Sequence, residues 1–562
     1  MNRRTLLAKA GSASLLAAFA PGGDISALTA SGKTGLLIAD PRSRGARGDA
    51  KSNDRNAIQE SIDECAAAGG GIVYIAPGIY LSGMLLLKSN VTLYLDAGAT
   101  ILGSKNIDDY PPQSGPDAHA DAGVRHLIAA RKADNIAICG HGTIDGQGPS
   151  FWKQNGTPAP TEDNLWRSVI TWEWEALPRP SPMIELIECT NVRIEGITLK
   201  DAPGWTLRPI ACNSVFIRGI RIRNHINGVN TDGIDVTCSQ NVLISDCDIS
   251  SADDAICIKS ENPYGPLELT RNITVTNCIL TGCCNGFKIG TATRGGIENI
   301  TFSNSIIENR DVPYNQRLEG GIVIEMVDGG WLEGITITGI RMQRARVPIF
   351  IRRGNRTPRP DGTPGYLRGV MIDGVHASGA IVTSSITGIP GFPVEDVTLS
   401  NIRIDSEEHG KEAWARAEVP EREQEYPKSL MFGRLPAAGL YCRHVADLRL
   451  HGIDLRLTAS EERPALICDD AGHIDVSGFR STSISGKQPV VLLNASRNVW
   501  LRDGRAPEQT DCYLEVRGKQ SAGIVLSHSD LINVRQTTVT TGGAAENAVT
   551  QSFNILRAAS AG

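Results

Sequence analysis

The sequence predicts an all-β protein: a single-stranded right-handed parallel β-helix, in which one chain winds through successive coils of short strands. Three observations carry this prediction: an internal repeat, alternation of apolar and polar residues with period two, and scarce helical periodicity. A helical pattern is confined largely to residues 57–67, ahead of the repeat.

The repeat is a phrase that alternates apolar and polar residues and then turns at glycine or asparagine. It reads Asn-Val-Arg-Ile-Glu-Gly-Ile at 191–197 and Ser-Val-Phe-Ile-Arg-Gly-Ile at 214–220. Coils set by the spacing of this phrase, each with several short strands, match a parallel β-helix. Leucine-rich repeats need a regular leucine frame, and propellers need longer antiparallel blades. The first apolar residue of the phrase recurs as Val192, Val215, Val242, Ile273, Ile300, Ile335, Val370, Val397, Leu448, Ile474 and Val499.

A second strand pattern, apolar-x-apolar-x, can be aligned over the middle coils. It reads Ile-Asp-Val-Thr at 234–237, Ile-Cys-Ile-Lys at 256–259 and Phe-Lys-Ile-Gly at 287–290. Its apolar members must point inward, so the intervening side chains line the outer face and form ladders across coils about 4.8 Å apart. We expect this outer ladder to contain Arg208, Asp235, Lys259, Lys288, Glu325 and Arg352.

Three carboxylates stand just before two of these strands: Asp232, and the pair Asp253 and Asp254. Asp232 and Asp254 hold the same register position on adjacent coils. Acids packed this closely repel one another when all are ionised, so one should keep its proton near neutral pH. A protonated acid beside an ionised base is the equipment of glycosidic-bond hydrolysis. For any single Asp, turn capping is the alternative role, and we expect Asp235 to support its neighbours.

Composition and the chain ends indicate the class and compartment. The formal net charge of −6 and the ordinary charged fraction of 21% exclude a disordered chain and give no basic surplus for nucleic acid. Residues 1–30 resemble an export signal of the twin-arginine type, since Arg3 and Arg4 precede a short apolar run. No other segment is apolar for long enough to span a membrane. We therefore expect an exported protein, periplasmic or extracellular.

The rest of the chain is expected to form one β-helix domain over residues 36–540, which carries the candidate site. Two loop excursions interrupt its rhythm, at 104–182 and at 405–440, and residues 541–562 look like a tail. Loops on a rigid scaffold often carry binding residues. Tryptophans in the first excursion would either stack on a ligand or pack the loop onto the solenoid.

At these residues the sequence resembles glycoside hydrolase family 28, the polygalacturonases and their relatives. The resemblance begins at 45–49, includes 142–148, and is most specific at 230–235 and at the Asp253-Asp254 pair. It implies the right-handed β-helix and the hydrolysis of pectic, uronic-acid-containing polysaccharide or oligosaccharide with inversion. It also implies that Asp253 is the general acid and that Asp232 and Asp254 hold and activate water. No cofactor or metal is expected.

Two departures from the family pattern concern substrate recognition. Asn285 stands where the family carries the histidine of a Gly-His-Gly segment, and Glu325 ends a Val-Ile-Glu segment where the family carries Arg-Ile-Lys. Ordinary endo-polygalacturonase activity is therefore less expected than a rhamnogalacturonan-type or exo-acting specificity. Lys259, Lys288 and Arg352 are candidates for a replacement anion contact; the alternative is a solvated charged face with Glu325 as internal partner.

Two other functions remain open from the sequence. A β-helical polysaccharide lyase would use a cation, often calcium, with the clustered acids as ligands, and a strong base. A non-catalytic glycan-binding or adhesion protein would suit the repeats equally well, but would not need Asp232, Asp253 and Asp254 together. A solenoid protects its core by capping its ends, so we expect a monomer.

Overall fold

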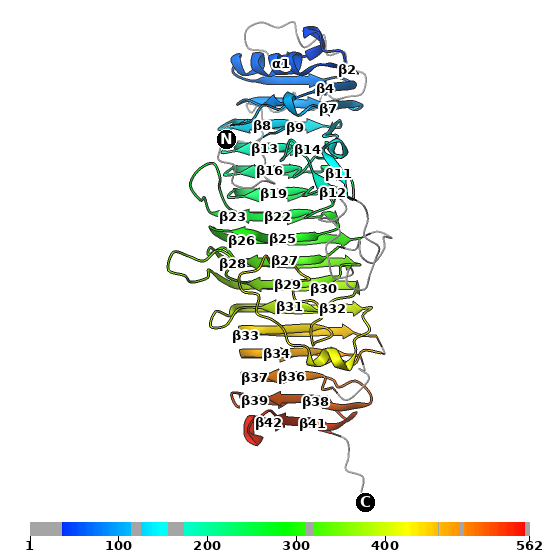
Figure 1. Cartoon of the computed structure of the whole chain (residues 1–562), viewed down its shortest axis with the longest axis vertical. Coiled ribbons are helices and arrows are strands. Elements are labelled where there is room, and N and C mark those ends of the chain that lie inside the picture. The colour runs from blue at the N-terminus through cyan, green and yellow to red at the C-terminus, as the bar shows by residue number, and fades with distance from the viewer. Residues whose placement is uncertain are drawn as a thin grey trace, which may run out of the picture.

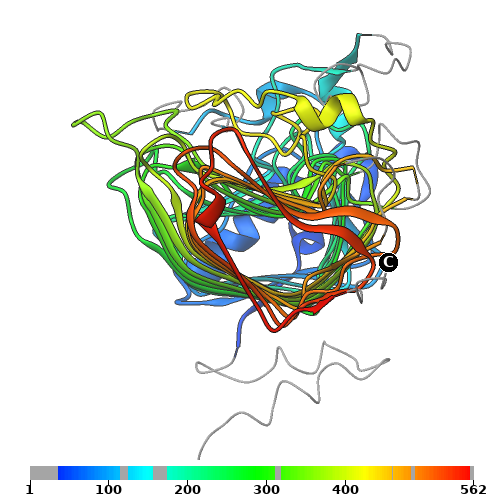
Figure 2. The ribbon, with the colours of Figure 1, turned by 90° about the horizontal axis from the view of Figure 1, so that it is seen from below.

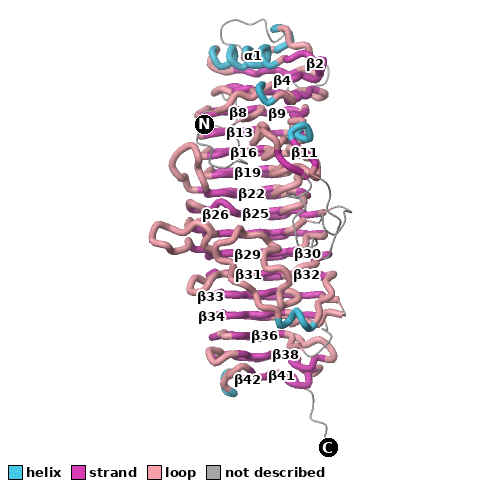
Figure 3. Tube along the Cα trace, viewed as in Figure 1, coloured by secondary structure: helices cyan, strands magenta, loops and turns pink. Residues whose placement is uncertain are grey.

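The chain folds into a right-handed parallel β-helix, which confirms the predicted fold (Figure 1). The computed structural model describes residues 36–113, 125–155, 174–309, 318–458, 460–482 and 488–556, so the predicted export signal at 1–30 lies outside the described residues. Nearly all strands of the described part join one parallel sheet that winds along the long axis, and helices are few (Figure 3).

Each coil contributes strands to three parallel ladders that run along the solenoid. The first, which we call the site ladder, contains β5 (Leu85–Leu86), β8 (Ile128–Arg131), β13 (Ile184–Ile187), β16 (Leu207–Ile210), β19 (Ile234–Thr237), β22 (Ile256–Ser260), β25 (Asn285–Thr293), β27 (Gly320–Met326), β29 (Val347–Arg353), β31 (Ser384–Thr387), β33 (Leu440–Arg456), β34 (Leu466–Ser477), β36 (Val491–Asn494), β38 (Thr510–Arg517) and β41 (Val534–Thr541).

The second ladder, the repeat ladder, also includes parts of β33 and β34. Its other strands are β1 (Ile38–Ala39), β3 (Gly71–Ile75), β6 (Val91–Leu95), β9 (Asp134–Gly140), β14 (Thr190–Glu195), β17 (Asn213–Arg218), β20 (Gln240–Ser245), β23 (Thr270–Thr276), β26 (Gly296–Glu308), β28 (Trp331–Gln343), β30 (Tyr366–Ala380), β32 (Val394–Ser406), β37 (Arg497–Arg502), β39 (Ala522–Ser527) and β42 (Val549–Ser552).

The long strands β26, β28, β30, β32 and β33 continue from the repeat ladder into the third ladder. Its separate strands are β2 (Asp49–Asn53), β4 (Gly78–Ser82), β7 (Ala99–Gly103), β10 (Thr143–Asp145), β15 (Thr198–Lys200), β18 (Arg221–Arg223), β21 (Asp248–Ser250), β24 (Ile279–Thr281) and β35 (Arg480–Ser481). Outside the main sheet lie the antiparallel pair β11 (Trp152–Gln154) and β12 (Trp174–Ala176) and the pair β40 (Asp530–Leu531) and β43 (Ile555–Leu556).

The repeat read from the sequence is the register of the repeat ladder. Val192 pairs with Val215, which pairs with Val242, and the same column continues to Val499. Parallel pairing brings equivalent residues together because a one-residue slip would turn every buried side chain to the outside. The buried apolar column follows directly from the alternation in the sequence.

Two predicted boundaries differ from the structure. The excursion at 104–182 is not one loop, because β8, β9 and β10 form a complete coil inside it and Ile136 of β9 pairs with Val192. The tail begins later than residue 541, because β42 pairs with β39 in the last coil. Residues 135–140 carry the repeat phrase as Asn-Ile-Ala-Ile-Cys-Gly, whereas the strand at 549–552 has one apolar residue and forms through its pairing with β39. The second excursion separates β32 from β33, so residues 407–439 leave the coil.

Helix α1 (Arg55–Ala67) covers the N-terminal end of the solenoid, close to the helical pattern expected at 57–67 (Figure 1). Its Ile58, Ile62 and Cys65 are fully buried, so the helix closes the apolar interior that the first coil would expose. Short 3-10 helices lie at Pro41–Arg44, Ile107–Asp109, Gly148–Phe151, Glu412–Arg416 and Glu546–Ala548. Among the described residues, no helix has the length and apolar character needed to cross a membrane.

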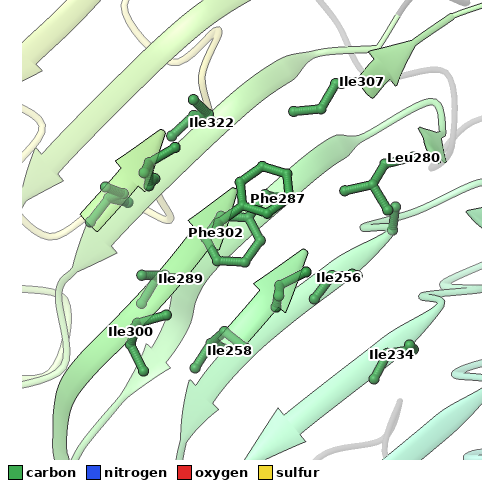
Figure 4. Close-up of a cluster of buried hydrophobic side chains, with 14 of the residues drawn as sticks. Ile234, Ile256, Ile258, Leu280, Phe287, Ile289, Ile300, Phe302, Ile307 and Ile322 are labelled. Carbon is green, nitrogen blue, oxygen red and sulfur yellow. The ribbon is translucent and has the colours of Figure 1, made fainter. Parts of the chain in front are cut away.

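The interior is filled by branched aliphatic residues and two stacked phenylalanines (Figure 4). The rings of Phe287 in β25 and Phe302 in β26 lie 4.4 Å apart between centroids and 12° from parallel. Ile256 and Ile322 pair with Phe287 from the coils on either side. This packing fixes β25, whose next outward residue, Lys288, belongs to the candidate site.

Long insertions leave the solenoid on one side. Seen along its axis, the yellow segment 407–439 and the cyan β11–β12 hairpin protrude from the same side of the ring of strands (Figure 2). Both insertions follow a strand of the third ladder and precede a strand of the site ladder. The candidate acids lie at the same turn of the coil.

Candidate active site

The acids stand at the turn that leads into the site ladder. Asp232 precedes β19, and Asp253 and Asp254 precede β22. The Gly233 N–H donates a hydrogen bond of 2.8 Å to the Asp254 carbonyl, so the two turns stack and Asp232 and Asp254 hold equivalent places on adjacent coils. A Cβ atom at position 233 would lie 2.3 Å from the Ala255 carbonyl oxygen, so the close approach of the coils requires glycine.

These turns open onto a pocket of about 170 Å³ above β19, β22 and β25. The pocket contains the three predicted acids and two of the predicted cations, together with residues from two loops. Its lining residues are Trp205, Asn230, Asp232, Asp253, Asp254, Lys259, Glu261, Lys288, Thr291, Ala292, Arg356 and Tyr426.

The predicted outer ladder divides into two rows. Cys257 pairs with Asp235 on one side and with Lys288 on the other, which forms the first row. The second row contains Lys259, which lies two residues after Cys257 in β22, and the pair Glu325 and Arg352. Their side chains are buried, because loops cover the outer face of the site ladder.

Asp253 and Asp254 are adjacent acids with opposite pKa shifts. Burial, reinforced by the negative charge of Asp254, raises the pKa of Asp253 to about 7. Burial also acts to raise the pKa of Asp254, but Lys288, Lys259 and a hydrogen bond from Asn285 together hold it below its usual value. The pair therefore combines an acid that keeps its proton near neutrality with a carboxylate that stays ionised.

Lys288 and Asn285 hold the Asp254 carboxylate from two sides. Lys288 Nζ lies 3.1 Å from Asp254 Oδ2, and the Asn285 Nδ2 amide donates a hydrogen bond of 2.7 Å to Asp254 Oδ1. Asn285 stands where the resembled family carries histidine. Its amide donates without a charge of its own, so the ionised state of Asp254 depends chiefly on the lysines.

Asp232 and Asp235 share the ammonium group of Lys259. Lys259 Nζ lies 2.6 Å from Asp235 Oδ1 and 3.4 Å from Asp232 Oδ2, and 3.6 Å from the centroid of the Trp205 ring. Burial raises the pKa of Asp232 well above its usual range, and the charges of Asp235 and Asp253 act in the same direction. The second oxygen of Asp232, Oδ1, is buried and has no hydrogen-bond partner among the described residues.

Glu325 lies behind Lys288 and is absent from the pocket lining. Its Oε2 is 3.8 Å from Lys288 Nζ and accepts a hydrogen bond of 2.9 Å from the Thr291 hydroxyl. Burial raises the pKa of Glu325 to about 7, although Lys288 opposes this effect. Glu325 therefore has the geometry of an internal partner for Lys288, which was one of the two roles open from the sequence.

Arg352 does not reach the pocket, and its expected contact with a substrate anion does not fit the structure. Its side chain is buried, with 1% exposed. One terminal nitrogen donates to the Gly388 carbonyl at 2.7 Å and the other to the Glu421 carbonyl at 2.6 Å. The sequence placed Arg352 on the correct face of β29 but carried no signal that residues 407–439 would cover it.

Seven of the lining residues were not predicted as site residues: Trp205, Asn230, Glu261, Thr291, Ala292, Arg356 and Tyr426. Arg356 follows β29, and its guanidinium donates to both carboxylate oxygens of Asp328, at 2.8 Å and 2.6 Å. Tyr426 comes from the 407–439 segment; its hydroxyl oxygen lies at hydrogen-bond distance, 3.0 Å, from the Thr291 hydroxyl oxygen, and its ring centroid lies 5.3 Å from the Arg356 guanidinium. The predicted loop excursion was the available signal for Tyr426.

Two of the four tryptophans in the first excursion, Trp152 and Trp174, lie among the described residues. Trp152 packs into the protein, because its indole N–H donates to the Pro203 carbonyl at 2.7 Å and its side chain is buried. Trp174 lies edge-on to His225, with 6.2 Å between ring centroids. Trp166 and Trp172 lie outside the described residues.

One group of side chains in the described part could hold a metal ion: Asp253, Asp254 and Cys284, whose ligand atoms lie within 4.8 Å of one another. Lys288 already provides a positive charge to this group at 3.1 Å from Asp254. An ammonium group in this position stabilises the Asp254 carboxylate as a bound cation would.

A right-handed parallel β-helix that carries a protonated and an ionised carboxyl group in one pocket belongs to the class of glycoside-cleaving enzymes. A model described as "Glycosyl hydrolases family 28" matches residues 78–424, and a model described as "Rhamnogalacturonase A/epimerase, pectate lyase-like" matches residues 41–111. The first match covers more than half of the chain, so the chain belongs to glycosyl hydrolases family 28. Membership in this family favours hydrolysis over the lyase and adhesion alternatives.

Individual relatives agree with this assignment. A probable polygalacturonase of Vitis vinifera is 26% identical over 383 residues, which cover 64% of this chain and 72% of the relative. A polygalacturonase of Ralstonia solanacearum is 27% identical over 337 residues, which cover 53% of this chain and 61% of the relative. An exopolygalacturonase structure from Thermotoga maritima superimposes with a TM-score of 0.52 at 22% identity, covers 66% of this chain and 87% of its own, and supports the fold.

Proposed function

We propose that this glycosidase hydrolyses glycosidic bonds of pectic, uronic-acid-containing polysaccharide or oligosaccharide by acid–base catalysis. The observation that carries the proposal is the pair Asp253 and Asp254, in which one carboxyl has its pKa raised to about 7 and its neighbour has its pKa lowered. The names of the polygalacturonase relatives support a pectic substrate.

In the proposed reaction Asp253 protonates the oxygen of the leaving sugar while the bond from that oxygen to the anomeric carbon breaks. A water molecule attacks the same carbon and gives its proton to Asp254, the acid of the three that is kept ionised. The unpartnered Oδ1 of Asp232 supports a role for Asp232 in holding this water.

The stereochemical outcome is part of the proposal and needs a direct test. The resemblance implies inversion, for which a gap of about 6.5–9.5 Å between acid and base is usual. The ligand atoms of Asp253 and Asp254 approach within 4.8 Å, which is shorter than this gap, so the proposed inversion depends on Asp232 to hold the water that Asp254 deprotonates. Proton NMR of the first-formed anomer decides the point: inversion supports this arrangement, and retention would contradict it.

The remaining predicted residues are proposed to act through the acids. Lys288 and Asn285 keep Asp254 ionised, Lys259 and Asp235 orient Asp232, and Glu325 positions Lys288. The positively charged side chains that line the pocket, and that could contact a uronate carboxylate, are Lys259, Lys288 and Arg356. Arg356 thus takes the place that the sequence suggested for Arg352.

The deciding experiment is product analysis on polygalacturonan and rhamnogalacturonan, by mass spectrometry and ultraviolet absorbance. Saturated products from the wild type that disappear in Asp253→Asn would support hydrolysis with Asp253 as acid. Asp248→Asn is the matched control, because Asp248 is a surface acid of β21 paired with Arg223. Unsaturated products would identify a lyase, and the absence of products from both polymers would contradict a pectic substrate.

Export of a monomer is the other part of the proposal. A polymeric substrate of this kind is outside the cell, and residues 1–30 carry the features of a twin-arginine signal. Replacement of Arg3 and Arg4 by lysine should retain the protein in the cytoplasm, as fractionation would measure. Sedimentation of the exported protein would test the monomer.

A further inference from the structure

The pocket is small and occupies only a short part of the site ladder. Its volume of about 170 Å³ is below the ~300 Å³ at which pockets for drug-sized ligands begin. A polymer chain bound along the solenoid would need the outer face of neighbouring coils as well. Whether that face is open determines where a polymer could be cut.

On the C-terminal side the outer face of the next coils is buried. Val323 of β27 and Phe350 of β29 are fully buried in a cluster with Leu430, against which Met431 and Phe432 also pack. A second cluster joins Leu435 and Ala437 to the outward residues of β33, β34 and β36, which are Tyr441, Ile467 and Leu492. The 407–439 segment therefore lies directly on the sheet beyond the pocket, along the side seen in Figure 2.

Polar contacts hold this segment in place as well. Arg352 donates to the Glu421 carbonyl at 2.6 Å, and Arg443 donates to the Val419 carbonyl at 2.6 Å. At the start of the segment, buried Arg463 pairs with Glu408 at 2.6 Å. A segment fixed at several points by charged donors, two of them buried, is a wall rather than a mobile lid.

The wall ends at Tyr426, which lines the pocket. Its hydroxyl contacts Thr291, its ring faces Arg356, and Lys288 Nζ lies 5.9 Å from the ring centroid. Arg356 is fixed in turn by two hydrogen bonds to buried Asp328. Tyr426, which is 50% exposed, and Arg356 therefore form the edge of the pocket beside Asp254.

On the N-terminal side the outward residues are buried too. Glu185 of β13 and Arg208 of β16 form a buried ion pair, and the Tyr264 hydroxyl donates a hydrogen bond of 2.9 Å to Glu185. The loop after β22 that carries Tyr264 thus covers this part of the sheet. Around the pocket the outer face is therefore covered on both sides, and the next hollow on it, of about 430 Å³ over β33, β34, β36 and β38, is separated from the pocket by the 407–439 segment.

We propose that this enzyme is exo-acting: it removes units from the end of a pectic chain, because the 407–439 segment with Tyr426 at its edge stops a polymer from passing the catalytic acids. This inference rests on the proposed hydrolysis and adds its mode of attack. A chain end enters a closed pocket, whereas internal cleavage needs room on both sides of the scissile bond.

The first test follows product size and viscosity during hydrolysis of the polymer preferred by the wild type. We expect a mono- or disaccharide from the earliest time points and almost unchanged viscosity while reducing ends accumulate. A ladder of intermediate lengths with a rapid fall in viscosity would overturn the inference and leave hydrolysis intact. No product from any pectic polymer or oligosaccharide would reject the proposed function and the inference together.

A second measurement separates binding from turnover. Oligosaccharides of increasing length are titrated into Asp253→Asn by calorimetry, and we expect affinity to stop rising after two or three sugar units. An affinity that continues to rise several-fold with each further unit would show an open groove and overturn the inference.

A substitution then tests whether Tyr426 limits the length of the products. In Tyr426→Ala we expect the share of products longer than a disaccharide to rise several-fold, because the edge of the pocket is removed. Tyr366→Ala is the control for loss of an aromatic side chain, since Tyr366 stacks on Trp331 away from the pocket; its product lengths should equal those of the wild type. Unchanged product lengths in Tyr426→Ala would show that Tyr426 does not block the polymer.

Discussion

The ammonium group of Lys288 lies 3.1 Å from the carboxylate of Asp254, and both side chains are buried. This contact is the main opposition to burial, which by itself would raise the pKa of Asp254. The neighbouring Asp253 has no such contact, and its pKa rises to about 7. Lys288, with Lys259 and Asn285, thus separates the protonation states of two consecutive acids.

Removal of this charge should change the acidic side of the pH profile. As the proposed base, Asp254 must be ionised, so activity is expected above its pKa and is lost as pH falls through it. In Lys288→Met the pKa of Asp254 rises, and we expect the acidic limb of kcat/KM to move up by ~1–3 pH units. Lys200→Met, which removes an exposed pair with Asp145, is the control. An acidic limb that stays at the wild-type pH would contradict the role of Lys288.

The alkaline limb of the pH profile should reflect the pKa of Asp253. A general acid works only when protonated, so activity is complete below its pKa and is lost as pH rises through about 7. Asp253→Asn should lower kcat roughly a thousandfold, within the usual range for general acid catalysis. The measurement is kcat/KM against pH in the wild type; an alkaline limb far from neutrality would assign the acid to another residue.

Asn285 should contribute through its hydrogen bond to Asp254 Oδ1. Hydrogen bonds to charged groups are worth ~1.5–3 kcal/mol, so Asn285→Ala should reduce kcat about 10- to 100-fold with little change in folding. Asn272→Ala, on the exposed side of the solenoid, should retain wild-type kcat. Equal values of kcat for Asn285→Ala and the wild type would show that the lysines alone keep Asp254 ionised.

Arg352→Ala should act on the wall and not on anion recognition. Its guanidinium donates to the carbonyls of Gly388 and Glu421, and each buried carbonyl left without a partner costs ~1–3 kcal/mol. We expect faster proteolytic cleavage within 407–439 and similar losses of affinity for acidic and neutral oligosaccharides. A loss confined to acidic oligosaccharides would restore Arg352 as a substrate contact.

The buried ion pair at the start of the same segment should matter for stability. Arg463 contacts Glu408 at 2.6 Å and Glu461 at 2.8 Å, and its side chain is fully buried. Arg463→Met removes the positive charge that compensates these two buried carboxylates, which should lower the free energy of unfolding by ~3–5 kcal/mol. Arg368→Met breaks an exposed pair with Glu333 and should cost at most ~1 kcal/mol. Urea denaturation of both variants makes the comparison; equal losses would contradict it.

The sequence was sufficient for the solenoid because its information is local and periodic. Apolar residues such as Val192 and Val215 recur on alternate positions, and parallel pairing of successive coils aligns them without any long-range choice. The position of the acids follows from the same register, since the turns before β19 and β22 stack directly and bring Asp232 beside Asp254.

The sequence placed Lys259, Lys288 and Arg352 on the outer face but did not determine which of them a ligand could reach. Exposure of that face depends on where residues 407–439 pack, and this follows from the contacts of Leu430 and the anchor at Arg352. No periodic signal encodes the path of a long loop over a sheet. The register, and with it the placement of the three candidate acids, was therefore determined by the sequence alone, whereas the covering of the pocket and the residues at its edge were decided only by tertiary packing.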